Sequence, residues 1–239
     1  MQPYFFPYLG YFQLIHAVDE FVISDQAQYI RRGWINRNRI LNAQKESIYI
    51  NIPVEKAPRD TKIKHILMND SSSWKEKIFH QLNYYHKAPN YTFVLNFLNE
   101  CLSFHTTSLS EFNTILLKKV CELLAIGTKI TVLSKEFPMI TEANEADEWG
   151  IEVSKALNAT TYINAIGGIE FYNEQKYVEN NLEIRFIKPN LKSYKQYDDP
   201  FIPNLSIIDV MMFNDLDEIK MMLNSFELFG KAGAGVSVK

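Results

Sequence analysis

A short basic segment of the chain combines arginines with aromatic and amide side chains. Its members are Tyr29, Arg31, Arg32, Trp34, Asn36, Arg37, Asn38 and Arg39. A guanidinium group donates paired hydrogen bonds to phosphate oxygens, and an aromatic ring can stack on a nucleobase. Residues 36–39 therefore predict a binding site for a nucleoside diphosphate. The alternative is a solvated loop whose arginines pair with surface carboxylates.

Asp25 is the best-placed carboxylate for acid–base chemistry. It directly follows residues 20–24, which predict a buried strand. A carboxylate at such a strand end can act as a general base or bind an amine. A structural role in the turn after the strand is the alternative.

Asn164, Gly167 and Gly168 follow a second predicted strand, residues 160–163. Backbone N–H groups in a turn of this kind can face an anion or a carbonyl oxygen. We therefore expect Asn164 and the two glycines to stabilise an oxyanion. A simple tight turn explains the glycine pair equally well, because the segment has neither the GxGxxG pattern nor a P-loop.

The chain begins with an aromatic segment, residues 2–15, that contains two prolines. The prolines prevent a helix before Gly10, and the apolar spacing after it predicts a helix over residues 9–18. An extended loop that leads into a helix N-terminus can hold an anion or a nucleotide. A turn that fills the core, and a structural helix histidine, are the alternatives. The candidate ligand contacts are Gln2, Tyr4, Gly10, Tyr11 and, as a catalytic residue, His16.

The composition is that of a globular protein rather than a nucleic-acid-binding or membrane protein. Of 239 residues, 46% are hydrophobic and 22% charged, and the net charge of −3 disfavours a nucleic-acid partner. No apolar run reaches the roughly 18 residues that a membrane span requires. The start does not read as a signal peptide, so we expect a cytoplasmic protein. We expect buried thiols at Cys101 and Cys121, and no metal, because the five histidines lack ligand spacing.

The order of predicted elements indicates an α/β fold. Strands are predicted at 20–24, 47–52, 62–68, 129–133, 160–163 and 182–187, and helices at 9–18, 72–85, 90–102, 108–127, 145–157, 170–180 and 215–228. Alternating strands and helices predict a mostly parallel sheet in a three-layer domain. We expect one domain over residues 1–229, with an all-helical insertion at about 72–126 and a disordered tail over 230–239. Ligands of such sheets bind at the C-terminal strand ends, where Asp25, Asn164 and Lys188 would converge.

Several short motifs follow one another along the chain in a fixed order. They are Q-P-Y-x-x-P-Y-x-G-Y-F-Q-L-I at residues 2–15, D-Q-A-Q-Y at 25–29, G-W-I-N-R-N-R-I at 33–40, Y-I-N-A-I-G-G at 162–168, Y-K-Q at 194–196 and F-I-P-N-L-S-I-I-D at 201–209. The ordered set resembles the WbqC-like family of bacterial surface-polysaccharide clusters, over roughly the whole of residues 1–229. The resemblance adds Gln28 and Gln196 as expected substrate-binding positions.

The resemblance implies work on precursors of O-antigen or capsule. Within that setting we expect an acyl- or aminoacyltransferase that modifies the amine of a nucleotide-linked amino sugar. Asp25 would supply the base, Asn164 with the two glycines the oxyanion donors, and the loop of Arg37 and Arg39 the nucleotide anchor. The implied donor is an acyl thioester of coenzyme A or of an acyl or aminoacyl carrier protein.

Two alternatives belong to other functional classes. Residues 7–15 faintly resemble the HxGH loop of nucleotidylyltransferases, but both histidines are missing. A non-catalytic scaffold that binds sugar nucleotides is the other alternative, with the aromatic first segment as a partner surface.

The sequence departs from the family pattern at two places. Relatives carry a short apolar strand before the Q-P motif, so a truncated N-terminus is an expectation. Relatives also have a basic residue where this chain has the acidic residues 147–148, which argues against phosphate binding there.

Overall fold

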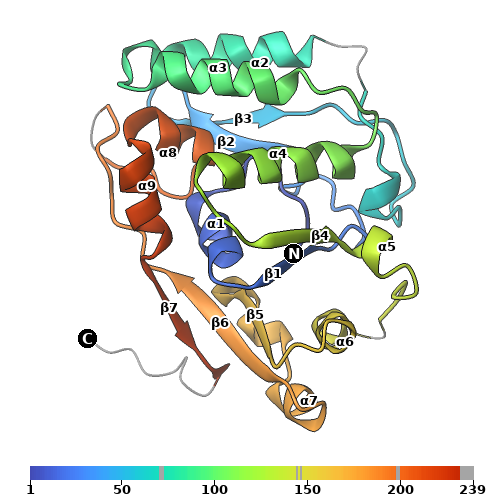
Figure 1. Ribbon diagram of the computed structural model, residues 1–239. Coiled ribbons are helices and arrows are strands. Elements are labelled where there is room, and N and C mark those ends of the chain that lie inside the picture. The colour runs from blue at the N-terminus through green and yellow to red at the C-terminus, as the bar shows by residue number, and fades with distance from the viewer. Residues whose placement is uncertain (70–72, 144, 146, 198–199, 232–239) are drawn as a thin grey trace.

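The structure is a computed structural model that describes residues 1–69, 73–143, 145, 147–197 and 200–231. Its centre is helix α1 (Leu9–His16) beside a parallel strand pair, β1 (Glu20–Ile23) and β4 (Lys129–Val132) (Figure 1). The short helix α5 (Leu133–Glu136) follows β4 directly. The hydroxyl of Thr128 donates to the carbonyl of Ile15 at 2.8 Å, which ties the start of β4 to the end of α1.

An antiparallel pair, β2 (Arg37–Leu41) and β3 (Ser47–Asn51), lies beneath the helices α2 and α3 in Figure 1. The sequence prediction of a loop over residues 25–40 is wrong for this strand. Asn38 and Ile40 are buried while Arg37 and Arg39 are half-exposed, the period-two pattern of a strand with one buried face. The high polarity of the segment masks that alternation in the sequence.

Helices fill the middle of the chain, as the sequence predicts, and the insertion stays a prediction. They are η1 (Ile63–His65), α2 (Trp74–Leu82), η2 (Asn83–Lys87), α3 (Tyr91–Leu102) and α4 (Leu109–Leu123). The predicted strand at 62–68 is wrong, because these residues form the turn η1 and isolated bridges such as Val54 with Met68. Ser72, a predicted helix cap, lies outside the described residues. The N-cap of α4 is Ser108, whose hydroxyl accepts the amide hydrogen of Glu111.

The second half of the chain builds a three-stranded sheet and several helices, of which the last two pack on the first half of the chain. In chain order these are α6 (Glu148–Ala156), β5 (Thr161–Ala165), η3 (Ile166–Phe171), α7 (Glu174–Glu179), β6 (Glu183–Pro189), α8 (Ile207–Phe213), α9 (Leu216–Leu223) and β7 (Phe226–Phe229). β5 and β6 are parallel, and β7 pairs antiparallel with β6. The predicted helix at 215–228 therefore ends early, because its last residues pair with β6. The predicted tail lies mostly outside the described residues.

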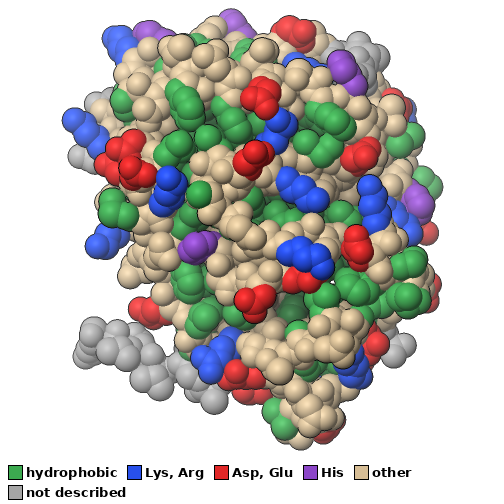
Figure 2. Space-filling view, viewed as in Figure 1, with side chains coloured by type: hydrophobic (Ala, Val, Ile, Leu, Met, Phe, Trp, Pro, Cys, Tyr) green, Lys and Arg blue, Asp and Glu red, His purple; other side chains and the backbone are tan. Residues whose placement is uncertain are grey.

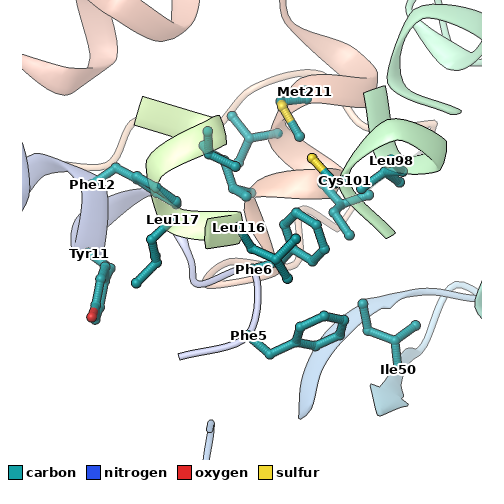
Figure 3. Packing of buried hydrophobic residues seen from close by; sticks show 14 of the residues in the cluster. Phe5, Phe6, Tyr11, Phe12, Ile50, Leu98, Cys101, Leu116, Leu117 and Met211 are labelled. Carbon is teal, nitrogen blue, oxygen red and sulfur yellow. The ribbon is translucent and has the colours of Figure 1, made fainter. Parts of the chain in front are cut away.

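Most buried side chains belong to one large hydrophobic cluster. Phe5 and Phe6 lie in it beside Leu98 and Cys101 of α3 and Leu116 of α4 (Figure 3). A smaller cluster beside the sheet of β5, β6 and β7 consists of Ile151, Tyr177, Leu182, Ile184 and Phe186. Both cysteines are free and buried, and burial raises the pKa of each thiol to about 12.

The mixture of helices and strands confirms the predicted α/β class. The described strands form three small sheets rather than one continuous sheet, and two of the three contain a parallel pair. The three-layer arrangement stays a prediction.

Candidate functional site

Two polar side chains, Asn38 and Ser206, hold the backbone of the aromatic N-terminal loop by hydrogen bonds. The amide nitrogen of Asn38 donates to the carbonyls of Phe5 at 3.0 Å and Phe6 at 2.8 Å. The hydroxyl of Ser206 also donates to the Phe6 carbonyl, at 2.7 Å. These bonds hold Phe6 at a φ of 39°, an unfavourable value for a bulky residue. The loop thus buries Phe5 and Phe6 and leaves Tyr8 half-buried.

A cavity of about 420 Å³ opens beside Tyr8, and we call it the Tyr8 cavity. Its walls come from the start of α1, the segments 190–194 and 201–205, and helices α8 and α9. Its side chains are mostly apolar or aromatic, with a few polar groups among them. They include Tyr8, Asn190, Lys192, Ser193, Tyr194, Phe201, Asn204 and Glu218. Volume and lining are those of a small-molecule site.

One wall of the Tyr8 cavity is fixed to a buried carboxylate. Asp209 is fully buried and accepts hydrogen bonds from Tyr194 at 2.5 Å, Tyr85 at 2.7 Å and Gln196 at 3.0 Å. Desolvation raises the pKa of Asp209 and, beside that carboxylate, the pKa of Tyr194 as well. Gln196 also bonds both backbone groups of Ile202. Gln196, a predicted substrate contact, therefore lies behind the wall, where its amide positions Tyr194 and the segment 201–205.

Arg39 lies next to the Tyr8 cavity. Its guanidinium group stands 5.5 Å from the ring of Trp34 and donates to the carbonyl of Asn204 at 3.4 Å, and Asn204 lines the cavity. The Nε atom of Arg39 is buried and has no hydrogen-bond partner among the described residues. A buried donor without a partner is costly, so this group has hydrogen-bonding capacity for an anion.

Arg37 occupies the same face of β2 but is already engaged. Its guanidinium carbon lies 4.1 Å from the ring centre of Tyr49, and its nitrogens donate to the carbonyls of Gly33 at 3.1 Å and of Arg32. Of the two predicted anchors, Arg39 is therefore the one with an N–H group that has no hydrogen-bond partner among the described residues.

Asp25 lines a second cavity, of about 350 Å³, which we call the Asp25 cavity. It opens at the C-terminal ends of β1 and β4, as expected for a ligand site of a parallel sheet. The carboxylate is 2% exposed and accepts the backbone N–H of Ser134 at 3.0 Å and its hydroxyl at 2.5 Å. Asp25 therefore fixes the start of α5 and also faces the cavity. The two cavities have no lining residue in common.

Asn164 lies in neither cavity lining, so the predicted convergence with Asp25 is not seen there. Its side-chain nitrogen donates to the hydroxyls of Tyr162, at 2.8 Å, and Tyr172, and its oxygen accepts the N–H of Ala165. Gly167 is exposed and has open space where a side chain would project, whereas Gly168 packs near Tyr172.

The other predicted contacts make bonds within the protein. The Tyr11 hydroxyl donates to the Gln2 carbonyl at 2.6 Å, and the Tyr4 ring lies 5.4 Å from the Tyr11 ring. Gln28 donates to the Arg59 carbonyl at 2.7 Å. The side chain of Asn36 accepts a hydrogen bond from the Tyr29 hydroxyl and donates one to the Ile52 carbonyl.

His16 is exposed, with its ring 3.1 Å from the Asn224 side chain. Gly10 has the Tyr8 ring where a Cβ would stand, so it allows the close approach behind the cavity.

Sequence reasoning missed the residues that complete both cavities. Lys64, Lys118 and Lys135 reach the Asp25 cavity from three different elements, and Glu218 reaches the Tyr8 cavity from α9. No local spacing marks them. Among the described residues there is no cluster of three metal-ligating side chains, and no helix there has the length and apolarity to cross a bilayer.

The fold is that of an α/β protein whose middle third is helical, and motifs from both ends of the chain line the Tyr8 cavity. The chain belongs to the WbqC-like protein family, whose model matches residues 2–221. It is also similar to the Mycobacterium tuberculosis protein Rv1507c, described as uncharacterized, at 30% identity over 218 residues, which cover 90% of this chain and 91% of that protein. No solved structure matches the chain.

Proposed function

We propose that the chain is a cytoplasmic enzyme of surface-polysaccharide biosynthesis that transfers an acyl or aminoacyl group to the amine of a nucleotide-linked amino sugar. The Tyr8 cavity is the proposed sugar site. One observation carries the proposal. The first motif and the last two motifs, far apart in the sequence, line this one cavity through Tyr8, Tyr194 and Asn204.

The lining suits a sugar ring. Tyr8, Tyr194 and Phe201 offer aromatic surface for the apolar faces of a pyranose, and Asn190 and Ser193 offer polar groups for its hydroxyls. Asp209 and Gln196 hold Tyr194 and the segment 201–205 in place, which supports a site whose walls are positioned without a ligand. A preformed site loses less entropy on binding.

Arg39 and Trp34 supply the proposed nucleotide anchor. The diphosphate would accept hydrogen bonds from the Arg39 guanidinium group, next to Asn204 at the cavity border, with the side chain shifting so that its unpaired Nε–H also takes part. Trp34, with 38% of its surface exposed, has room to stack a base. This arrangement puts the sugar in the cavity and the nucleotide outside it.

Glu218 is the carboxylate that we assign to the substrate amine. One of its oxygens accepts the N–H of Asp215 at 2.8 Å, and the residue lines the cavity from its exposed rim. The amine nitrogen would attack the acyl carbon of a thioester, the C–S bond would break, and the proton released by nitrogen would leave with the thiol. Holding the amine beside the donor supplies the proximity that such a reaction needs.

Asp25, Asn164 and His16 are the catalytic residues that the sequence predicts. For any of them to act on an amine bound in the Tyr8 cavity, it would have to reach that cavity from outside its lining. Their roles in catalysis stay predictions.

Incubation with nucleoside-diphosphate-linked amino sugars and acyl-coenzyme A donors tests the proposal by mass spectrometry. We expect the sugar nucleotide to gain the mass of the acyl group and the donor to release its thiol. Release of pyrophosphate from a sugar phosphate and a nucleoside triphosphate would instead support nucleotidyl transfer. Sugar-nucleotide binding without turnover, with coenzyme A and carrier-protein donors alike, would support the scaffold.

A further inference from the structure

The Asp25 cavity carries charged groups of both signs in equal number. Its cations are Lys64, Lys118 and Lys135, and its anions are Asp25, Glu111 and Glu136. Acidic and basic side chains are interspersed over the face that α4, β4 and α5 form in Figure 2. A cavity for a phosphate alone would have an excess of cations, and a cation site would have few lysines. The balance favours a ligand that itself carries both charges.

These charges are only partly paired within the protein. Lys135 lies 4.0 Å from Glu111, whose other oxygen accepts the hydroxyl of Thr106 at 2.6 Å. Lys64 and Lys118 form no ion pair with any residue in the part of the chain that the structure describes. Their ammonium groups are therefore available to a carboxylate.

Thr131 gives a second and independent indication of a polar ligand. It lines the cavity, is 6% exposed, and its hydroxyl oxygen is buried without a hydrogen-bond partner among the described residues. A buried hydroxyl with no partner costs free energy, which a ligand group can recover. Asp25 adds acceptor capacity, since Ser134 supplies only two of the roughly four hydrogen bonds that a carboxylate can accept.

We propose that the Asp25 cavity binds a small zwitterion of the α-amino acid class. The ligand's ammonium group donates to the Asp25 carboxylate and to the Thr131 hydroxyl, and its carboxylate accepts from Lys64 and Lys118. A volume of about 350 Å³ accommodates such a molecule. The site is separate from the Tyr8 cavity, so the inference goes beyond the proposed function and does not depend on it.

Titration of the full chain with each standard L-amino acid, followed by ligand-observed NMR, tests the proposal in the absence of any sugar nucleotide. We expect saturable binding of at least one amino acid. Its N-acetyl derivative and its methyl ester, which each lack one charge, should bind at least about tenfold more weakly. Equal binding of all three forms, binding of inorganic phosphate in their place, or no binding at millimolar concentrations would overturn the proposal.

Three variants locate the site. Lys118→Gln should weaken amino acid binding about tenfold or more. Lys119→Gln should not, because Lys119 lines no part of the cavity and pairs with Glu100 outside it. Thr131→Val keeps the side-chain shape and removes only the unpartnered hydroxyl. It should weaken binding while leaving the melting temperature unchanged or higher. Unchanged affinity in both Lys118→Gln and Thr131→Val would contradict the assignment, and failure of sugar binding would leave these results unaffected.

Discussion

Tyr194 donates a hydrogen bond of 2.5 Å to Asp209, and this bond joins the wall of the Tyr8 cavity to the protein interior. Asp209 is fully buried, and its other carboxylate oxygen accepts from Tyr85 of the helical insertion. The Tyr85 hydroxyl in turn accepts the N–H of Leu41 in β2. One carboxylate therefore connects the insertion, the strand that carries Arg39, and the cavity.

Tyr194→Phe should destabilise the fold by about 1.5–3 kcal/mol, the range for a hydrogen bond to a charged group. The ring would stay in place, so the loss reports the bond to Asp209. Chemical unfolding measures the change. Tyr91→Phe is the control, because its hydroxyl bonds the exposed Asn83 side chain and its loss should cost less than about 1 kcal/mol. Equal losses of unfolding free energy in the two variants would mean that the buried Tyr194–Asp209 bond stabilises the fold no more than the exposed Tyr91–Asn83 bond.

The stability of the fold should depend on the ionisation of Asp209. Burial raises the pKa of this carboxyl above its ordinary value of 3.8. Between these two pKa values the native state binds more protons than the unfolded state, so the free energy of unfolding falls as pH rises through the interval. Urea unfolding over a pH series should show a shallower fall in Asp209→Asn. If the unaltered protein and Asp209→Asn show the same dependence of unfolding free energy on pH, the Asp209 carboxyl does not contribute to it.

Gly10→Ala should damage the Tyr8 cavity. A Cβ atom at this position would stand 2.4 Å from the Tyr8 ring and 2.8 Å from the Pro189 ring, so the wall of the cavity must shift. We expect a lower melting temperature and weaker sugar-nucleotide binding, although alanine is the better helix former. Gly167→Ala is the matched control, since no heavy atom lies within 4 Å of its Cβ position. If Gly10→Ala behaves like Gly167→Ala, the close approach at Tyr8 is unimportant.

Asp25→Asn separates a catalytic role from ligand binding in the Asp25 cavity. We expect unchanged sugar-nucleotide affinity, because the two cavities have no lining residue in common. A general base, as the sequence predicts, would also require a fall in turnover of about 10²–10⁴. Measured turnover near that of the unaltered protein would remove Asp25 from the chemistry. The melting temperature should accompany the assay, since Asp25 also binds Ser134 at the start of α5.

Helix caps and the spacing of apolar residues correctly predicted elements such as helix α4. Helix α4 has a Ser108 cap and a long apolar face, and both are visible in the sequence. β7 is different, because Phe226–Phe229 is a strand only through its pairing with β6, in which Phe229 lies opposite Phe186. β2 was missed for a related reason, since its partner β3 decides the conformation of a polar segment.

The same distinction applies to the candidate sites. Asp25 follows a predictable strand, and the structure places it at the edge of a cavity. The Tyr8 cavity joins Tyr8, Tyr194, Asn204 and Glu218, which lie in four separate segments. No spacing along the chain relates them, so packing alone shows that they meet.

Calorimetric titration of a nucleoside-diphosphate-linked amino sugar into Arg39→Ala and Arg37→Ala tests the central claim most directly. The two arginines share one face of β2, but only Arg39 adjoins the Tyr8 cavity with an unpartnered buried donor. We predict that Arg39→Ala weakens binding by about 1.5–3 kcal/mol, that Arg39→Lys recovers only part of this, and that Arg37→Ala has a smaller effect. Unchanged affinity in Arg39→Ala, with the fold intact by circular dichroism, would contradict the assignment of the sugar nucleotide to this cavity.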